Sequence, residues 1–110
     1  MSEIANRRRS HRISCNLSVE YKFRGGRLRG GQITNLGTNG LLLTISGTTP
    51  PVGAELLLRF YLPPKNCRVQ VIGSVRWTTQ GTAGVKFTIL SHQAQAEIRE
   101  YCKRESARAA

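Results

Sequence analysis

The clearest pattern in the chain is an unbroken alternation of apolar and polar residues over 13–23. The apolar positions are Ile13, Cys15, Leu17, Val19, Tyr21 and Phe23. A period of two is typical of a β-strand with one buried face. Gly25-Gly26 follows at once and suits a hairpin turn, because glycine accepts positive φ angles. The sequence therefore predicts a hairpin leading into a second strand over 28–34, where Gly30-Gly31 indicates a bulge or a close backbone approach.

Four more strands are predicted from short apolar or alternating segments separated by turns. They cover residues 41–45, 55–62, 67–77 and 83–89. A turn is expected over 35–40, and the alternation of the fifth strand is broken at Ile72. Six antiparallel strands of this length remove their exposed edges best by closing into a barrel.

The spacing of apolar residues changes from two to helical after Ser91, which is a candidate N-cap. Ala94, Ile98, Tyr101 and Cys102 form one narrow apolar stripe at helical spacing. Fraying is expected over 105–110, and residues 1–6 lack periodicity and are expected to form a flexible tail. The predicted fold class is all-β: a six-stranded antiparallel β-barrel with a C-terminal α-helix, in one domain.

The charge of the chain is strongly positive, with 17 Lys and Arg against six acidic residues, all Glu, and a formal net charge of +11. Such a surface attracts anions, so nucleic acid, nucleotides, anionic lipid headgroups and acidic proteins are all candidate partners. Many of the cations gather near the N-terminus. They include Arg7, Arg8, Arg9 and Arg12, which we expect to form a flexible arm over 7–12. Guanidinium groups suit both phosphate oxygens and the O6/N7 edge of guanine.

A second short motif is Asn35-x-Gly37-x-x-Gly40, in the turn predicted between the second and third strands. Backbone N–H groups in a tight turn can approach an anion, and Asn35 adds a side-chain amide. Taken alone, each motif has a plainer interpretation: a solvated tail for the arginines and an ordinary hairpin connection for the glycines.

The sequence contains no recognisable catalytic combination. There is no Asp, no serine in a GxSxG turn, and no Cys or His at zinc-ligand spacing. Cys15 and Cys67 fall on the apolar phase of their strands, so we expect both to be buried thiols in a reducing, cytoplasmic setting. No apolar segment has the length of a membrane span or a secretory signal. We therefore expect a binding module and not an enzyme.

Together, the two motifs and their order resemble the PilZ domain family. Arg8-x-x-x-Arg12 is similar to its RxxxR motif, and Asn35 to Gly40 is similar to its [D/N]xSxxG motif, with Gly37 in place of Ser. Gly73-x-Val75-x-Trp77 and Gly84-Val85-x-Phe87 are similar to its late strands. The resemblance covers residues 7–104. It implies a six-stranded barrel with a C-terminal helix that acts as a bacterial receptor for cyclic di-GMP, with no cofactor.

The resemblance also implies roles for particular residues. Arg8 and Arg12 would meet phosphates and guanine edges, while Arg7 and Arg9 would strengthen the positive field. Asn35 would contact a guanine edge, and the turn containing Gly37 and Gly40 would let the backbone come close. Trp77 either packs in the core or barrel mouth, which its strand phase favours, or lies against a guanine or ribose.

The arm would close over the ligand and present a new surface to a protein partner that the sequence does not identify. One alternative is a PilZ-like interaction module that binds protein and no nucleotide. Another is a basic barrel, similar to an OB-fold, that binds single-stranded nucleic acid. Nucleic acid is disfavoured because such surfaces display aromatic stacking platforms. Most of the aromatic residues here fall on the predicted core phase.

Overall fold

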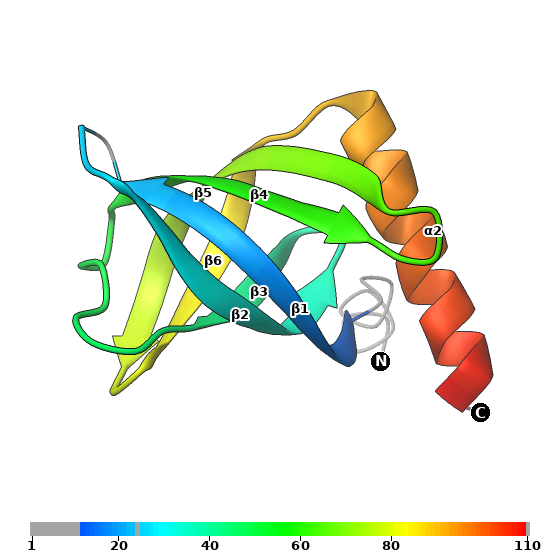
Figure 1. Ribbon diagram of the computed structural model, residues 1–110, viewed down its shortest axis with the longest axis horizontal. Coiled ribbons are helices and arrows are strands. Elements are labelled where there is room, and N and C mark those ends of the chain that lie inside the picture. Colours follow the sequence, from blue (N-terminus) through cyan, green and yellow to red (C-terminus); the bar gives the residue numbers. More distant parts are fainter. Residues whose placement is uncertain (1–11, 24, 110) are drawn as a thin grey trace, which may run out of the picture.

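The computed structural model describes residues 12–23 and 25–109, and it confirms the predicted fold class. The elements are β1 (Arg12–Phe23), β2 (Leu28–Gly37), β3 (Gly40–Thr44), β4 (Glu55–Leu62), β5 (Cys67–Thr79), β6 (Thr82–Ile89) and α2 (His92–Ala109). The six strands pair antiparallel in the closed order β1-β2-β3-β6-β5-β4, as Figure 1 shows. Arg7, Arg8 and Arg9 of the predicted arm lie outside the described residues.

The core fills the interior of the barrel with the inward residues of every strand. Tyr21 and Phe60 are the largest of its fully buried side chains. The alternation in β1 thus corresponds to a strand with one face in the core, as predicted. Phe23 is the exception, since it ends the strand at the rim of the barrel and is 41% exposed.

The β1–β2 hairpin forms where the glycine pair predicts it. Gly25 has a φ of 72°, and the Gly26 N–H donates to the Phe23 carbonyl at 2.7 Å. Gly31 marks a close approach, because a Cβ there would lie 3.1 Å from the Thr44 carbonyl oxygen. The irregularity of this strand pair lies elsewhere, between Ser14 and Leu17 of β1.

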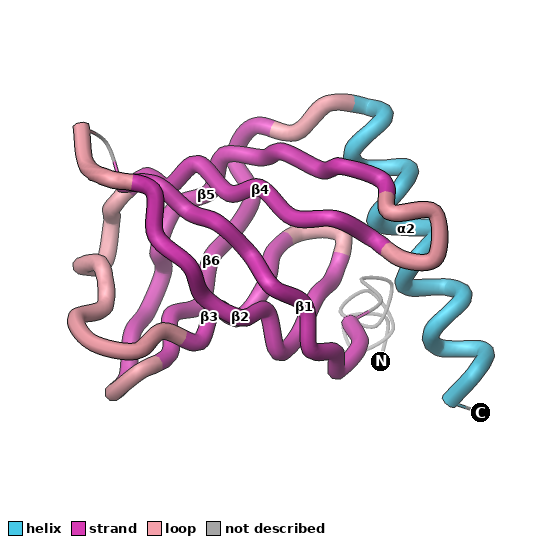
Figure 2. The backbone as a smooth tube through the Cα atoms, viewed as in Figure 1, coloured by secondary structure: helices cyan, strands magenta, loops and turns pink. Residues whose placement is uncertain are grey.

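Helix α2 packs across one end of the barrel, while the β1–β2 turn and the β3–β4 loop form the opposite end (Figures 1 and 2). The Ala94 N–H donates to the Ser91 Oγ at 3.0 Å, which confirms the predicted N-cap. The apolar stripe of the helix is buried against the strands. The helix continues to Ala109 where fraying from Glu105 is expected, and an Arg108–Glu105 ion pair of 3.0 Å lies in its last turns. No helix in the described part of the chain is both long and apolar enough to cross a membrane.

The thiols are less uniformly buried than the strand phases predict. Cys15 and Cys67 are only half-buried, because Cys15 lies at the β1 irregularity and Cys67 begins β5 at the barrel rim. Cys102 on α2 is fully buried. Burial raises the pKa of Cys15 and of Cys102 to about 11, so both remain protonated at neutral pH.

Candidate ligand-binding face

The second motif belongs mainly to two strands and only partly to a turn, which corrects the predicted turn over 35–40. Strand β2 continues to Gly37 and β3 begins at Gly40, so the connection is Thr38-Asn39 alone. The Asn39 carbonyl accepts a hydrogen bond of 2.8 Å from the Phe87 N–H, which ties this turn to β6. In the described part of the chain, the glycines with positive φ do not include Gly37 or Gly40. Gly37 and Gly40 are therefore not required by the backbone conformation of the turn.

Gly40 is required by the close approach of β3 to β6. A Cβ at this position would overlap the carbonyl oxygen of Val85. Gly37 is buried and lies opposite Arg12 in the β1–β2 register. Both glycines thus keep the backbone bare at the point where the arm joins the barrel.

The fold brings the end of the arginine arm onto the second motif. Arg12 is the first residue of β1, and its Nε donates to Asn35 Oδ1 at 2.8 Å. The two residues are 23 positions apart in the sequence and meet because β1 and β2 pair antiparallel. Any ligand held by the arm would therefore lie near Asn35.

A row of paired residues crosses the outer face of the barrel from β1 to β5. The row contains Ser14, Asn35, Leu42, Gly84 and Trp77, one residue from each successive strand. Three strand spacings separate Asn35 from Trp77, which is roughly 14 Å at about 4.8 Å per strand. This face contains a depression of about 460 Å³, and the residues that line it include Arg12, Gly40, Leu42, Arg76, Trp77 and Lys86.

Trp77 lies on this outer face and not in the core, so the favoured expectation from its strand phase is wrong. Its side chain is 44% exposed. The β5–β6 register shifts between Val75, which pairs with Val85, and Trp77, which pairs with Gly84. Arg76 is therefore an extra residue in β5, a β-bulge that resets the alternation. The indole lies over Gly84, because a Cβ there would overlap the ring.

The bulge also brings Arg76 and Trp77 to the same face. Regular alternation would place Arg76 and Trp77 on opposite faces, yet both line the same depression. The available sequence signal was weak. The alternation of β5 is already broken at Ile72, where a second register shift occurs.

The depression combines positive charge with apolar surface. Its described lining includes Arg12, Arg76 and Lys86 but no acidic residue. Leu42, which is half-buried, and Trp77 supply the apolar part. This combination suits a ligand that has both negative charges and flat aromatic rings.

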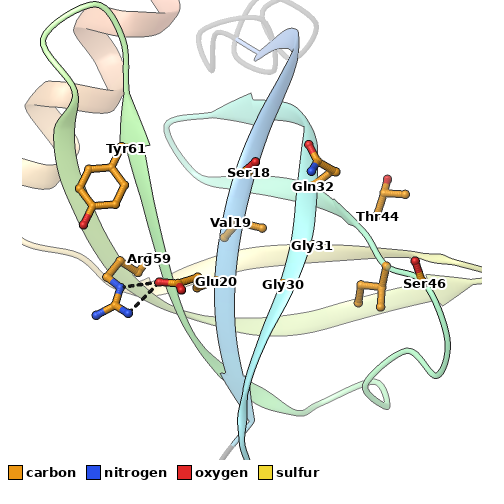
Figure 3. Close-up of a pocket in the computed structure, with 11 residues that line it drawn as sticks. Ser18, Val19, Glu20, Gly30, Gly31, Gln32, Thr44, Ser46, Arg59 and Tyr61 are labelled. Carbon is orange, nitrogen blue, oxygen red and sulfur yellow. Dashed lines mark hydrogen bonds and ion pairs between the residues drawn. The ribbon is translucent and has the colours of Figure 1, made fainter.

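A larger groove of about 800 Å³ lies on the outer face of β1, β2 and β4, away from the predicted ligand residues (Figure 3). Its charges are balanced within the protein. The Nε and Nη2 atoms of Arg59 donate to Glu20 Oε1 at 3.1 and 2.7 Å. This hydrogen bonding raises the pKa of Arg59. The groove is larger than the depression, but it offers an anion less unpaired positive charge.

The model of the PilZ domain family matches residues 6–104, nearly the whole chain, so the chain belongs to the PilZ family. No functionally curated protein matches it. Several solved structures share the fold. The Bacillus subtilis inhibitor of motility MotI/DgrA has a TM-score of 0.79 at 16% identity, covering 90% of this chain and 51% of that one. The chain thus spans about half the length of MotI.

Two other similar structures contain c-di-GMP. The PilZ domain of YcgR from Escherichia coli with c-di-GMP has a TM-score of 0.71 at 12% identity, covering 94% of this chain and 96% of that one. The Borreliella burgdorferi PlzA protein in complex with c-di-GMP has a TM-score of 0.64 at 18% identity, covering 91% and 43%. At these identities the likeness shows a common fold.

Proposed function

We propose that this chain is a cyclic di-GMP receptor that binds the nucleotide in the depression on the outer face of β3, β6 and β5, with Arg12 of β1 at its edge. The observation that carries the proposal is the Arg12–Asn35 hydrogen bond at the edge of a depression lined by cations and no described acid. Membership of the PilZ family and the ligands of YcgR and PlzA support the choice of nucleotide.

The arm and the second motif would together form one half of the site. Arg12 binds Asn35 through Nε, so its terminal Nη groups are the donors that would reach a phosphate or a guanine edge. Arg8 would act with Arg12, and Arg7 and Arg9 would add positive field. Each charge-assisted hydrogen bond would contribute about 1.5–3 kcal/mol. These bonds would offset the entropy lost when the arm becomes ordered.

The barrel would form the other half. Trp77 would present the exposed face of its indole to a guanine, and base–aromatic stacking contributes about 1–3 kcal/mol. Asn35 would contact a guanine edge through its amide. Gly37 and Gly40 would keep side chains away from the backbone where the nucleotide lies.

The output of binding would be a change of conformation and not a chemical reaction. A ligand that binds only the closed arm shifts the population towards that state. The ordered arm and the bound nucleotide would then form a surface that a protein partner recognises. This adaptor role is the function we infer for the chain.

The described aromatic residues support this function over binding of single-stranded nucleic acid. Tyr21, Phe60, Phe87 and Tyr101 are buried, Phe23 lies at the rim of the barrel, and the exposed Tyr61 lines the larger groove. Trp77 is thus the one described aromatic residue on the cation-lined face. A single aromatic platform suits a compact nucleotide better than a long strand, which stacks successive bases.

Isothermal titration calorimetry with cyclic di-GMP tests the proposal, with GMP and a random single-stranded RNA as comparison ligands. We expect saturable binding of cyclic di-GMP and much weaker binding of GMP. Backbone NMR should show shifts at residues 7–12 and 35–40 on addition of the nucleotide. Absence of heat and of shifts would leave a PilZ module that recognises protein alone. Tighter binding of RNA with a steep salt dependence would favour the nucleic-acid function.

A further inference from the structure

The β-bulge in β5 places the indole of Trp77 on the same outer face as Arg76, whereas strand alternation would have put these two side chains on opposite faces. Val75 is fully buried and pairs with Val85, whereas Arg76 and Trp77 are both exposed and line the depression. A bulge bends its strand and re-aims side chains, and bulges occur preferentially beside functional sites. Here the re-aimed side chain is the indole of Trp77, which the bulge places on the outer face beside the guanidinium of Arg76.

Lys86 approaches the same depression from the neighbouring strand β6. It is exposed, and it pairs with Gly40 of β3 on one side and with Ser74 of β5 on the other. Among the described glutamates, Glu55 is two strands away from Lys86, with Ser74 between them. It does not line the depression, so the positive charge of Arg76 and Lys86 is not balanced within it.

We propose that Arg76 and Lys86 form a second anion-binding subsite beside Trp77, which takes a phosphate group of a phosphodiester ligand. The proposal rests on the proposed function and adds residues that neither sequence motif contains. Arg12 lies on β1, and β2 and β3 separate it from Lys86 on β6. Measured along the curved wall of the barrel, the two cationic ends are thus roughly 14 Å apart at the backbone, and long side chains from each end can reach towards the middle.

This arrangement selects a ligand with two phosphates over one with a single phosphate. A nucleotide with one phosphate can occupy either cationic end but not both. A ligand with two phosphates and two bases can contact Arg12 and the Arg76–Lys86 subsite together and place one base against Trp77. The second phosphate belongs either to the same ligand molecule or to a second molecule, and the binding stoichiometry distinguishes these two sources.

The first experiment tests the subsite without any nucleotide. Trp77 is the only tryptophan, so its fluorescence reports this location alone. Iodide is an anionic quencher that the subsite should concentrate, whereas acrylamide is neutral. We expect Arg76→Ala and Lys86→Ala each to lower the iodide Stern–Volmer constant by about 1.5-fold or more, with acrylamide quenching unchanged.

The control for this experiment is Arg68→Ala. Arg68 is also exposed on β5, but it donates to Gln70 at 3.0 Å and does not line the depression. The control removes the same charge from the same strand and should leave both quenching constants unchanged. Equal iodide quenching in wild type and Arg76→Ala would overturn the subsite, as would a parallel change with acrylamide.

The second experiment is calorimetry with cyclic di-GMP and GMP on the same three variants. We expect Arg76→Ala to weaken cyclic di-GMP binding by about 10-fold and to change GMP binding much less. The control Arg68→Ala should bind both ligands with wild-type affinity. If the wild type binds cyclic di-GMP and Arg76→Ala binds it with the same affinity, the subsite is overturned and the receptor function stands. If the wild type does not bind cyclic di-GMP, the receptor function is overturned, and iodide quenching still decides whether the subsite exists.

Discussion

Two of the hollows on the outer surface of this protein differ in their charge, and the smaller of the two has the chemistry of a binding site. The groove over β1, β2 and β4 is nearly twice as large, at about 800 Å³ against about 460 Å³. Its arginine, Arg59, is paired with Glu20 within the protein. The depression on the other face has Arg12, Arg76 and Lys86 and no described acid. Unbalanced charge beside an exposed aromatic ring is therefore a better guide to the ligand than volume.

The two hollows also use glycine differently. At Gly40, on the ligand-binding face, a Cβ would overlap a backbone oxygen, so no side chain fits. At Gly30, in the larger groove, a Cβ would meet nothing within 4 Å. Gly40 is required for β3 to pair closely with β6, whereas a side chain at Gly30 would extend into open space.

The largest expected effect concerns this difference between glycines. Gly40→Ala should lower the free energy of unfolding by about 1–3 kcal/mol, because β3 and β6 must separate to accommodate the methyl group. Gly30→Ala should change it by less than about 0.5 kcal/mol. Urea unfolding of both variants measures the contrast. Similar stabilities for the two variants would show that the close approach at Gly40 relaxes without cost.

The next effect compares the arginines of the two hollows. Arg12→Ala should weaken cyclic di-GMP binding by about 10-fold or more, since at least one charge-assisted hydrogen bond is lost. Arg59→Ala should leave the affinity within about 2-fold, because that guanidinium is already bound by Glu20. Calorimetry on both variants makes the comparison. A larger loss for Arg59→Ala would move the binding site to the larger groove.

A smaller effect is expected from Gly84→Ala, which acts on Trp77 without removing it. The added methyl group would displace the indole, so we expect binding about 3- to 5-fold weaker and a shifted tryptophan emission maximum. Gly30→Ala serves as the control, with unchanged affinity and emission. If Gly84→Ala shifts the emission maximum but binds cyclic di-GMP with unchanged affinity, the position of the indole seen here does not contribute to ligand binding.

The smallest effect is expected from Gly37→Ser, which introduces the serine of the [D/N]xSxxG motif that residues 35–40 resemble. Gly37 does not need positive φ, so its backbone should tolerate the change. We expect cyclic di-GMP affinity to be preserved or to improve by up to about 3-fold, as one more neutral hydrogen bond would allow. Complete loss of binding with an unchanged urea midpoint would mean that the ligand requires a bare backbone at this position.

Much of the fold was predictable because its signals are local. Strand β4 has the predicted bounds, and the alternation in β1 identifies its buried face. Ser91 caps the helix as its position before the apolar stripe suggests. In each of these cases residues a few positions apart in the sequence determine the local structure, so the partner strand did not have to be known.

The errors in the predicted site arise where two strands decide the outcome together. A period-two pattern predicts that Trp77 faces the core and Arg76 faces away from it. The bulge turns Trp77 to the outer face beside Arg76, and it exists only in the register between β5 and β6. Likewise, residues 35–40 contain glycines typical of a turn, but pairing with β1 and β3 keeps Asn35 and Gly37 in a strand.

The sequence by itself determined the barrel, the helix, the excess of positive charge and the two short motifs, because hydrophobic period, capping and composition are properties of the chain alone. Only the tertiary structure decided that Arg12 meets Asn35, that Trp77 lies over Gly84, and that Arg76 lines the same face. The physical reason is that strand register and bulges are set by pairing between distant segments. They fix on which face of the barrel each side chain lies.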